Sequence, residues 1–397
     1  MNKLLMSAAM TLTMGVMATP ASSATIVLND LGGVGAGSQA LQGFGIAAEF
    51  WASRLTNNVT VNLDVSFRSL DAGVLGQAGS RSFVVDVETI QSQIAAVGTS
   101  SLDAIAAANL PPLTLGEYGV GALSVYTPGA LYAGGLGADA LSKVLDNDGG
   151  GNNSFLDANS ANLKALGFTG FGDVADGTIQ FSSDFKFDFD PSDGIAGDSI
   201  DFISVAIHEI GHILGFVSGV DTYDILGYPN GVLWNDPDFG ALPLGDFAIG
   251  SVLDLYRYSA GNAGTALDWT VGGTPFFSID GESAYGGGFS TGAFNGDGRQ
   301  ASHWKDNIVG MPQLGALDPT VAYGQMGRVT SLDLAAFDAI GWNVDYDVLN
   351  SGRSFSTRDI YFAAIPEPTT WALTIIGFFV MGASLRANRR RPAFARA

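Results

Sequence analysis

His208, Glu209 and His212 form the pattern H-E-x-x-H, whose residue types and spacing could carry out hydrolysis. The two histidines are four residues apart, so on a helix both imidazoles leave the same face and can hold one zinc ion. Glu209 follows the first of them and can reach a water molecule on the metal. Because zinc lowers the pKa of that water, the pattern predicts attack on a carbonyl carbon with Glu209 as the general base.

The segment around this pattern predicts the helix that must position it. Residues 202–216 are mostly apolar, Asp198 or Ser199 is the expected N-cap, and Asp201 falls in the first turn. Gly215 stands where a helix can end and the chain can turn back under the metal. A glutamate and two histidines are costly in an apolar helix without a partner, which favours a metal site over a chance match.

A catalytic zinc site needs a third protein ligand and leaves its fourth position to water. His303 is the only other histidine in the chain, and we expect it to be that ligand. The fold must then bring it across from far along the sequence. Asp221, much closer to the motif, is the alternative ligand, and a glutamate elsewhere is another.

The rest of the chain predicts a mixture of helices and strands, and therefore an α+β fold. Residues 41–55 carry an apolar stripe at helical spacing, and residues 59–67 alternate like a half-buried strand. Alternating phenylalanines predict a strand over 179–189, just before the motif helix. Further helices are expected at 87–97, 102–108 and 331–340, the last after a capping-box-like start at 330–333.

A turn-rich stretch partly resembles a calcium loop. Asp146, Asp148, Asn152 and Asp157 fall at positions one, three, seven and twelve, with Gly151 at six. Position five lacks a side-chain ligand, so a plain surface turn is the alternative. Calcium is therefore a second cofactor prediction beside zinc.

Composition narrows the classes of function. The chain has a net charge of −21, which argues against a nucleic-acid partner because phosphate binding needs a basic face. It has no cysteine, so it can have neither a cysteine nucleophile nor a cysteine zinc site. Since 47% of the residues are apolar, the chain can bury a large core.

Both ends have the character of export signals. Residues 1–24 combine a basic start, an apolar stretch and small residues at Ser22 and Ala24, which predicts a cleaved signal peptide. At the other end, residues 366–368 read Pro-Glu-Pro, an apolar segment follows, and Arg389–Arg391 lie in a basic tail that should stay cytoplasmic. These three parts, in this order over 366–397, resemble the PEP-CTERM sorting signal of Gram-negative bacteria. An ordinary C-terminal membrane anchor is the alternative.

The motif and the third histidine together resemble the zinc site of metzincins. Metzincins continue H-E-x-x-H-x-x-G-x-x-H, but Ser218 stands at the last position here. Leishmanolysin-like metzincins instead take their third histidine from a later Ser-His-Trp, which residues 302–304 match. The resemblance implies zinc held by His208, His212 and His303.

Longer phrases also resemble a bacterial family of PEP-CTERM-anchored metalloproteases. They lie at 253–259, 300–306 and 332–342. This resemblance implies a metalloprotease domain over 25–347, with an insertion at 219–300 between the zinc ligands, followed by a linker at 348–365. The implied fold is metzincin-like, with a twisted mixed sheet, an active-site helix and a C-terminal subdomain.

Metzincins place a methionine turn beneath the zinc, and the chain departs from them here. Leu317 occupies the expected place, and Met311 is the nearby alternative. The resemblance also offers Tyr323 as a residue near the zinc, and the strand at 179–189 as the edge strand that pairs with an extended substrate.

We therefore expect an exported zinc endopeptidase whose substrate is a protein or peptide. PEP-CTERM resemblance implies transient anchoring in the inner membrane, processing by a sorting protease, and delivery to the outer surface or extracellular matrix. The alternative is a non-enzymatic surface or exopolysaccharide-matrix protein that contains zinc, and a zinc hydrolase of non-peptide amides is also open. The intact Glu209 favours an enzyme, because a structural zinc site does not need it.

Overall fold

The computed structural model describes residues 23–71, 73–261, 264–307 and 311–365, together with 378–379 and 381. These residues form a mixed α and β structure with several small sheets and nine α-helices. The expected signal peptide and sorting segment lie almost wholly outside the described residues. Within the described part, no helix is both long and apolar enough to cross a membrane.

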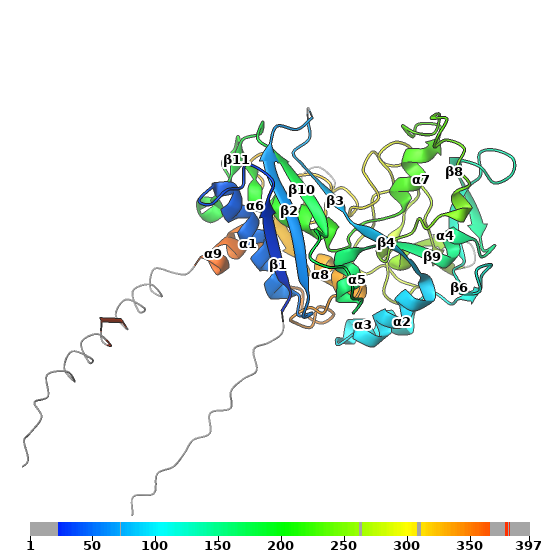
Figure 1. Cartoon of the computed structure of the whole chain (residues 1–397), viewed down its shortest axis with the longest axis horizontal. Helices are drawn as coiled ribbons and strands as arrows, with labels where there is room; N and C mark the ends of the chain where they lie inside the picture. The colour runs from blue at the N-terminus through cyan, green and yellow to red at the C-terminus, as the bar shows by residue number, and fades with distance from the viewer. Residues whose placement is uncertain are drawn as a thin grey trace, which may run out of the picture.

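The largest sheet lies beside the helix that carries the H-E-x-x-H motif and has the strand order β1-β2-β10-β3 (Figure 1). Its strands are β1 (Thr25–Asp30), β2 (Thr60–Arg68), β10 (Gly177–Ser182) and β3 (Gly76–Ser80). The first three run parallel, whereas β3 runs antiparallel to β10 and forms one edge. Val61, Leu63 and Val65 of β2 are fully buried, as the alternation of this segment predicts.

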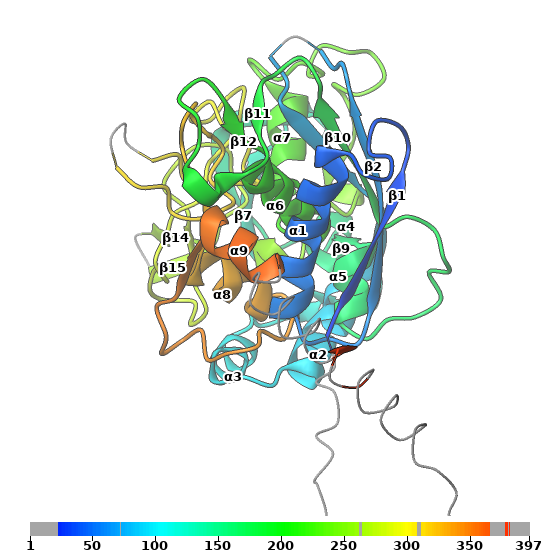
Figure 2. The same cartoon turned by 90° about the vertical axis from the view of Figure 1, so that its left-hand side faces the viewer.

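Helices α1 (Gln39–Arg54) and α6 (Phe202–Ile213) pack against one another on one side of this sheet (Figure 2). Phe44 of α1, Phe181 of β10 and Phe202 of α6 meet there, with ring centroids 4.8–5.2 Å apart. Gly43 allows the close approach, because a Cβ at this position would lie 2.4 Å from the ring of Phe202. Aromatic packing therefore fixes the motif helix on the sheet.

The single strand expected over 179–189 is wrong. Residues 177–182 form β10, which lies inside the sheet, and Phe187–Asp188 form β11, which pairs with β12 (Ile200–Asp201) across a separate two-stranded ladder. The phenylalanines alternate across the intervening turn because those on both sides of it pack on Phe202. The alternation therefore indicates that these phenylalanines are buried on the same side, not that they form one strand. The strand at the edge of the sheet near the motif helix is β3.

The helices expected at 87–97, 102–108 and 331–340 are confirmed as α2 (Val87–Val97), α3 (Ser101–Ala108) and α8 (Ser331–Ala339). A second group of elements lies around α7 (Val220–Leu226), beside the large sheet in Figure 1. Its remaining helices and main strands are β4 (Ser82–Asp86), β7 (Val125–Gly129), β8 (Ala138–Asp146), α4 (Gly151–Ser154), β9 (Phe155–Asn159), α5 (Ser160–Ala165), β13 (Gly227–Tyr228), β14 (Arg257–Gly261), β15 (Gly264–Leu267) and β16 (Phe276–Phe277).

The segment 348–365, expected to be a linker, is part of the folded body. It contains β18 (Ser354–Ser356), which pairs with β17 (Arg328–Thr330), and α9 (Thr357–Ala364), which packs on α1. Ser356 and Asp359 form a capping box that starts α9. The sequence did not predict this short helix, because polar residues dominate the segment between the expected protease domain and the expected sorting segment.

Candidate metal centre

Helix α6 carries the H-E-x-x-H residues, and Asp201 is its N-cap. The Asp201 carboxylate accepts a hydrogen bond from the Ser204 amide at 3.0 Å and from the Gly327 amide at 3.1 Å. The expected N-cap, Asp198 or Ser199, is therefore wrong by two or three residues. Asp201 is buried, and this burial raises its pKa despite the donors. Its second bond ties the start of the motif helix to the segment just before β17.

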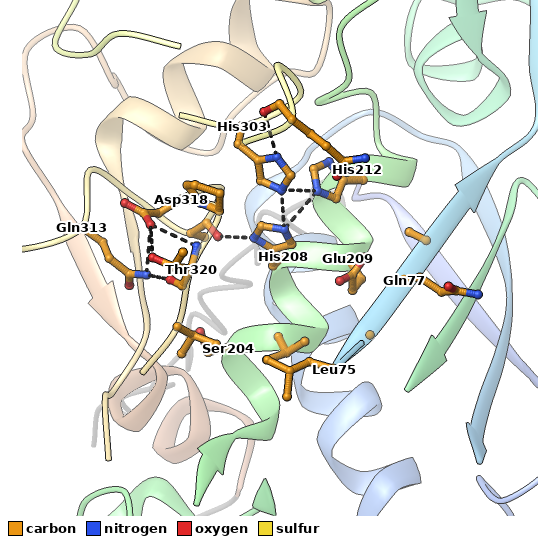
Figure 3. A pocket seen from close by; sticks show the side chains of 17 residues that line it. Leu75, Gln77, Ser204, His208, Glu209, His212, His303, Gln313, Asp318 and Thr320 are labelled. Atoms are coloured by element: carbon orange, nitrogen blue, oxygen red, sulfur yellow. Dashed lines mark hydrogen bonds between the residues drawn. The ribbon is translucent and has the colours of Figure 1, made fainter. Parts of the chain in front are cut away.

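The structure brings His208, His212 and His303 together although His303 lies far along the chain. The Nε2 atoms are 3.0 Å apart between His208 and His212, 3.1 Å between His208 and His303, and 3.3 Å between His212 and His303 (Figure 3). A tetrahedral zinc ion with Zn–N bonds of about 2.0–2.1 Å would separate its nitrogen ligands by about 3.3 Å. The three nitrogens therefore match the corners of such a site.

The opposite nitrogen of each imidazole meets a backbone carbonyl oxygen. His208 Nδ1 lies 2.8 Å from Ala316 O, His212 Nδ1 lies 2.7 Å from Phe216 O, and His303 Nδ1 lies 3.2 Å from Gln300 O. A carbonyl oxygen can only accept, so each Nδ1 must carry the proton. Each Nε2 then presents a lone pair to the shared centre, which is the tautomer that a metal ligand needs.

Burial keeps all three imidazoles neutral. Burial, followed by the charge of His212, lowers the pKa of His208 to about 3. Burial also lowers the pKa of His212, and burial followed by the neighbouring histidines lowers that of His303 well below its ordinary value. Three lone pairs therefore face one another with no proton between them, and a cation is the group that such an arrangement suits.

Asp221, the alternative ligand, lies behind the loop that carries His303. Its carboxylate accepts hydrogen bonds from the Ala301 amide at 2.6 Å, the Ser302 amide at 3.1 Å and the Ser302 hydroxyl at 2.5 Å. The metal-ligating cluster found among the described residues contains the three histidines and not Asp221. Asp221 is thus a positioning residue for His303, and nothing in the sequence around Asp221 predicts this role.

A second buried carboxylate, Asp333 of α8, holds the segment on the other side of the site. It accepts hydrogen bonds from the indole of Trp304 at 2.8 Å, the Ala316 amide at 2.9 Å and the Thr330 amide at 2.7 Å. Ala316 supplies the carbonyl oxygen that meets His208. One carboxylate therefore links the residue after His303 to the segment that orients His208.

Leu317 lies beneath the motif helix, where a metzincin would have its methionine. It is fully buried, and a Cβ added to Gly211, between the two motif histidines, would lie 3.2 Å from its side chain. Met311 is 61% exposed, so it does not replace Leu317 in this place. Tyr323 is 56% exposed and does not line the cavity at the histidines. The predictions for Met311 and Tyr323 are therefore wrong, because the chain after His303 turns these side chains outward.

Glu209 lies beside the three imidazoles and faces the edge strand β3 (Figure 3). It is 7% exposed, and its carboxylate makes no hydrogen bond or ion pair within the described part of the chain. Burial raises its pKa to about 8. A Cβ added to Gly76 of β3 would lie 3.4 Å from its Oε1. The carboxylate is thus left for a partner that enters the cavity.

A cavity of about 460 Å³ opens over the histidines. One wall is the segment Leu75–Ala78, which contains the start of β3, and the facing wall is Ala316 with Asp318–Val321. The outer edge of β3 pairs with no described strand, and Gly76–Ala78 of this strand line the cavity. Asp318 accepts from the Thr320 amide at 3.2 Å, while its Oδ2 is buried without a partner. The sequence did not reveal β3, Asp318 or the facing wall.

The residues of the expected calcium loop do not gather around one point. Asp146 accepts from the Asn152 amide at 2.7 Å and lines a cavity with Asp148 and Asn152. Asp157 lies on β9 and lines a different cavity. The four residues therefore do not form the predicted loop geometry, because the chain enters β9 before the twelfth position.

Comparison with protein-family models, with curated proteins and with solved structures found no match.

Proposed function

We propose that this chain is a zinc-dependent endopeptidase with a metzincin-like site. The convergence of three unprotonated Nε2 atoms at 3.0–3.3 Å, each imidazole oriented by a backbone carbonyl, is the observation that carries the proposal. Zinc suits three neutral imidazoles with a fourth position left to water. His208, His212 and His303 would hold it.

Bound zinc would supply Lewis acidity and lower the pKa of water at the site. Glu209 would accept the proton of the attacking water and return it to the leaving nitrogen of the peptide. Its burial and its lack of a partner among described residues suit this role, because a carboxylate of raised pKa both takes and gives a proton near neutral pH. A purely structural zinc site would have no use for such a group.

The neighbouring edge strand supports a peptide as the substrate. An extended peptide could pair with the outer edge of β3 and so place a carbonyl carbon over the histidines. The cavity is bounded on the other side by Asp318–Val321, which would limit how the peptide lies. These features favour a peptide over a small amide and over a non-enzymatic matrix protein. Export and sorting remain predictions from the two terminal segments.

The test is the zinc dependence of proteolysis. We expect the purified full chain to degrade an unfolded protein such as casein, to lose activity with a chelator, and to regain it when zinc is returned. His303→Ala should lose activity together with tight zinc binding. Casein cleavage that survives complete removal of metal would contradict the proposal.

A further inference from the structure

A second cavity, of about 290 Å³, adjoins the metal centre on the side of His212. Ala78, His212 and Gln300 line both cavities, so the two form one cleft that passes the imidazoles. The second cavity continues along the extended segment from β3 to β4, with Ser80 and Ser82 in its wall. A peptide that pairs with β3 would therefore project side chains into it.

Hydroxyl groups line much of this second cavity, and they offer acceptors. The Ser218 hydroxyl donates to Asp254, the Ser251 hydroxyl donates to Val217 O, and the Ser302 hydroxyl donates to Asp221. Their protons point away into the protein, and the three oxygens accept the backbone amides of Val220, Asp254 and Ser218 respectively, so one lone pair of each oxygen remains for a guest. A side chain rich in donors suits such a cavity, because it can use these remaining acceptor positions.

Asp157 supplies a negative charge in the same cavity. It lies on β9 opposite Val84, two residues before Asn159, whose amide donates to His212 O at 2.8 Å. Residues two apart on a strand are separated by about 7 Å and point to the same face of the strand. Asp157 is therefore the next side chain along this face of β9 after Asn159, which contacts the end of α6. Its carboxylate makes no hydrogen bond or ion pair within the residues that the structure describes.

Among the described residues, no lysine or arginine lines either cavity, whereas Asp157 lines the second. Asp157 is therefore the charged side chain in the lining of the second cavity, and no basic side chain in that lining neutralises it. The cavity beyond His212 thus combines an unpaired carboxylate with hydroxyl acceptors. This combination matches an ammonium or guanidinium group.

We propose that Asp157 determines specificity by binding a lysine or arginine side chain of the substrate on the His212 side of the scissile bond. The proposal rests on the proposed peptidase function and adds a substrate class to it. Because an extended peptide advances about 3.3 Å per residue, the basic residue should lie within about three residues of the bond. Both basic side chains have stems long enough to reach Asp157 from β3.

The test uses quenched fluorescent peptides that differ in one residue, placed in turn at each of the three positions on either side of the bond. At one position, lysine or arginine should raise kcat/KM about 10- to 100-fold over glutamine, the range expected for a charged hydrogen bond. Asp157→Asn should abolish this preference, so that the variant cleaves the lysine and glutamine peptides with similar kcat/KM. Asp157→Lys should favour glutamate at that position. Glu49→Gln, an exposed change on α1 with the same loss of charge, should retain the wild-type preference.

Binding provides a readout that does not need turnover. We expect Glu209→Gln to bind the lysine peptide about tenfold or more tightly than the glutamine peptide by fluorescence anisotropy, and the double variant with Asp157→Asn to bind both alike. Cleavage without any basic preference would overturn this inference and leave the peptidase function standing. Failure of the wild type to cleave any peptide, with zinc bound, would overturn both.

Discussion

At the scale of single residues, the site depends on carboxylates that neither hold the metal nor meet the substrate. Asp221 binds the loop of His303, and Asp333 binds both Trp304 and the segment that orients His208. Mutation of residues that orient metal ligands typically lowers metal affinity by about 10- to 100-fold. Sequence spacing could identify the imidazoles but not these supports.

Replacing Asp221 should loosen the His303 loop. Asp221→Ala leaves the amides of Ala301 and Ser302 without their acceptor, so we expect zinc affinity to fall about 10- to 100-fold with the fold retained. A competition titration with a zinc indicator measures this. Asp236→Ala, which removes the acceptor of one bond within a local turn, is the control and should bind zinc normally. Equal affinities in both variants would mean that Asp221 does not position His303.

Leu317 offers a test of the departure from the metzincin turn. Leu317→Met should cost less than about 1.5 kcal/mol in the free energy of unfolding, because it nearly conserves volume beneath Gly211. Leu317→Ala should cost about 2–5 kcal/mol, because it leaves a cavity under the helix. Denaturant unfolding of both variants measures these values. If the methionine variant were as unstable as the alanine variant, the packing described for Leu317 would be wrong.

At the scale of elements, the sequence predicted helices better than strand neighbours. Residues 202–213 formed the motif helix, and α2, α3 and α8 were confirmed, because apolar spacing and caps are local. The position of β10 inside the sheet and of β3 at its edge depends on long-range pairing, which alternation cannot report. For the same reason the cluster of three histidines was predictable by residue type, while the loop that delivers His303 was not.

The packing of α3 on α8 should depend on pH. Burial, followed by the charge of Asp103, raises the pKa of Asp338 to about 7, and Ser100 donates to its carboxylate at 2.7 Å. Because the pKa of Asp338 in the folded protein lies above the ordinary value of 3.8, its protonated form stabilises the fold. This contribution is complete below about pH 4 and is lost as the pH rises through about 7.

Asp338→Asn should therefore be more stable than the wild type at pH 8, by roughly 2–4 kcal/mol, and should lose this advantage near pH 4. Chemical denaturation at several pH values, on metal-free protein of both forms, gives the difference in the free energy of unfolding. A difference that does not change with pH would show that Asp338 titrates normally in the folded protein.

At the scale of the whole molecule, the candidate metal centre joins segments far apart in the chain. His208 and His212 come from α6 on the large sheet, whereas His303 comes from the loops between β16 and β17. Much of that region has little regular structure and is held by buried carboxylates such as Asp254, which accepts from Ser218, Gly219 and Ser251. A metal ion at the histidines would add a cross-link between these parts.

Zinc should accordingly stabilise the entire fold. At a free zinc concentration 100 times its Kd, a ligand that binds only the folded state adds about 2.7 kcal/mol to the free energy of unfolding. We expect the Tm of the wild type to rise with zinc and to fall with chelator, and that of His303→Ala to change much less. Calorimetry on both proteins measures the shift. An equal response to zinc in both would place the stabilising ion elsewhere.

The most direct measurement is the rate of casein cleavage by the wild type and by Glu209→Gln at equal, full zinc occupancy. Removing a general base typically costs about 10²- to 10⁴-fold, so the account predicts cleavage by the wild type and a loss of at least this order in the variant. Equal rates in the two proteins would contradict it. So would a fully zinc-loaded wild type that cleaves neither casein nor any peptide.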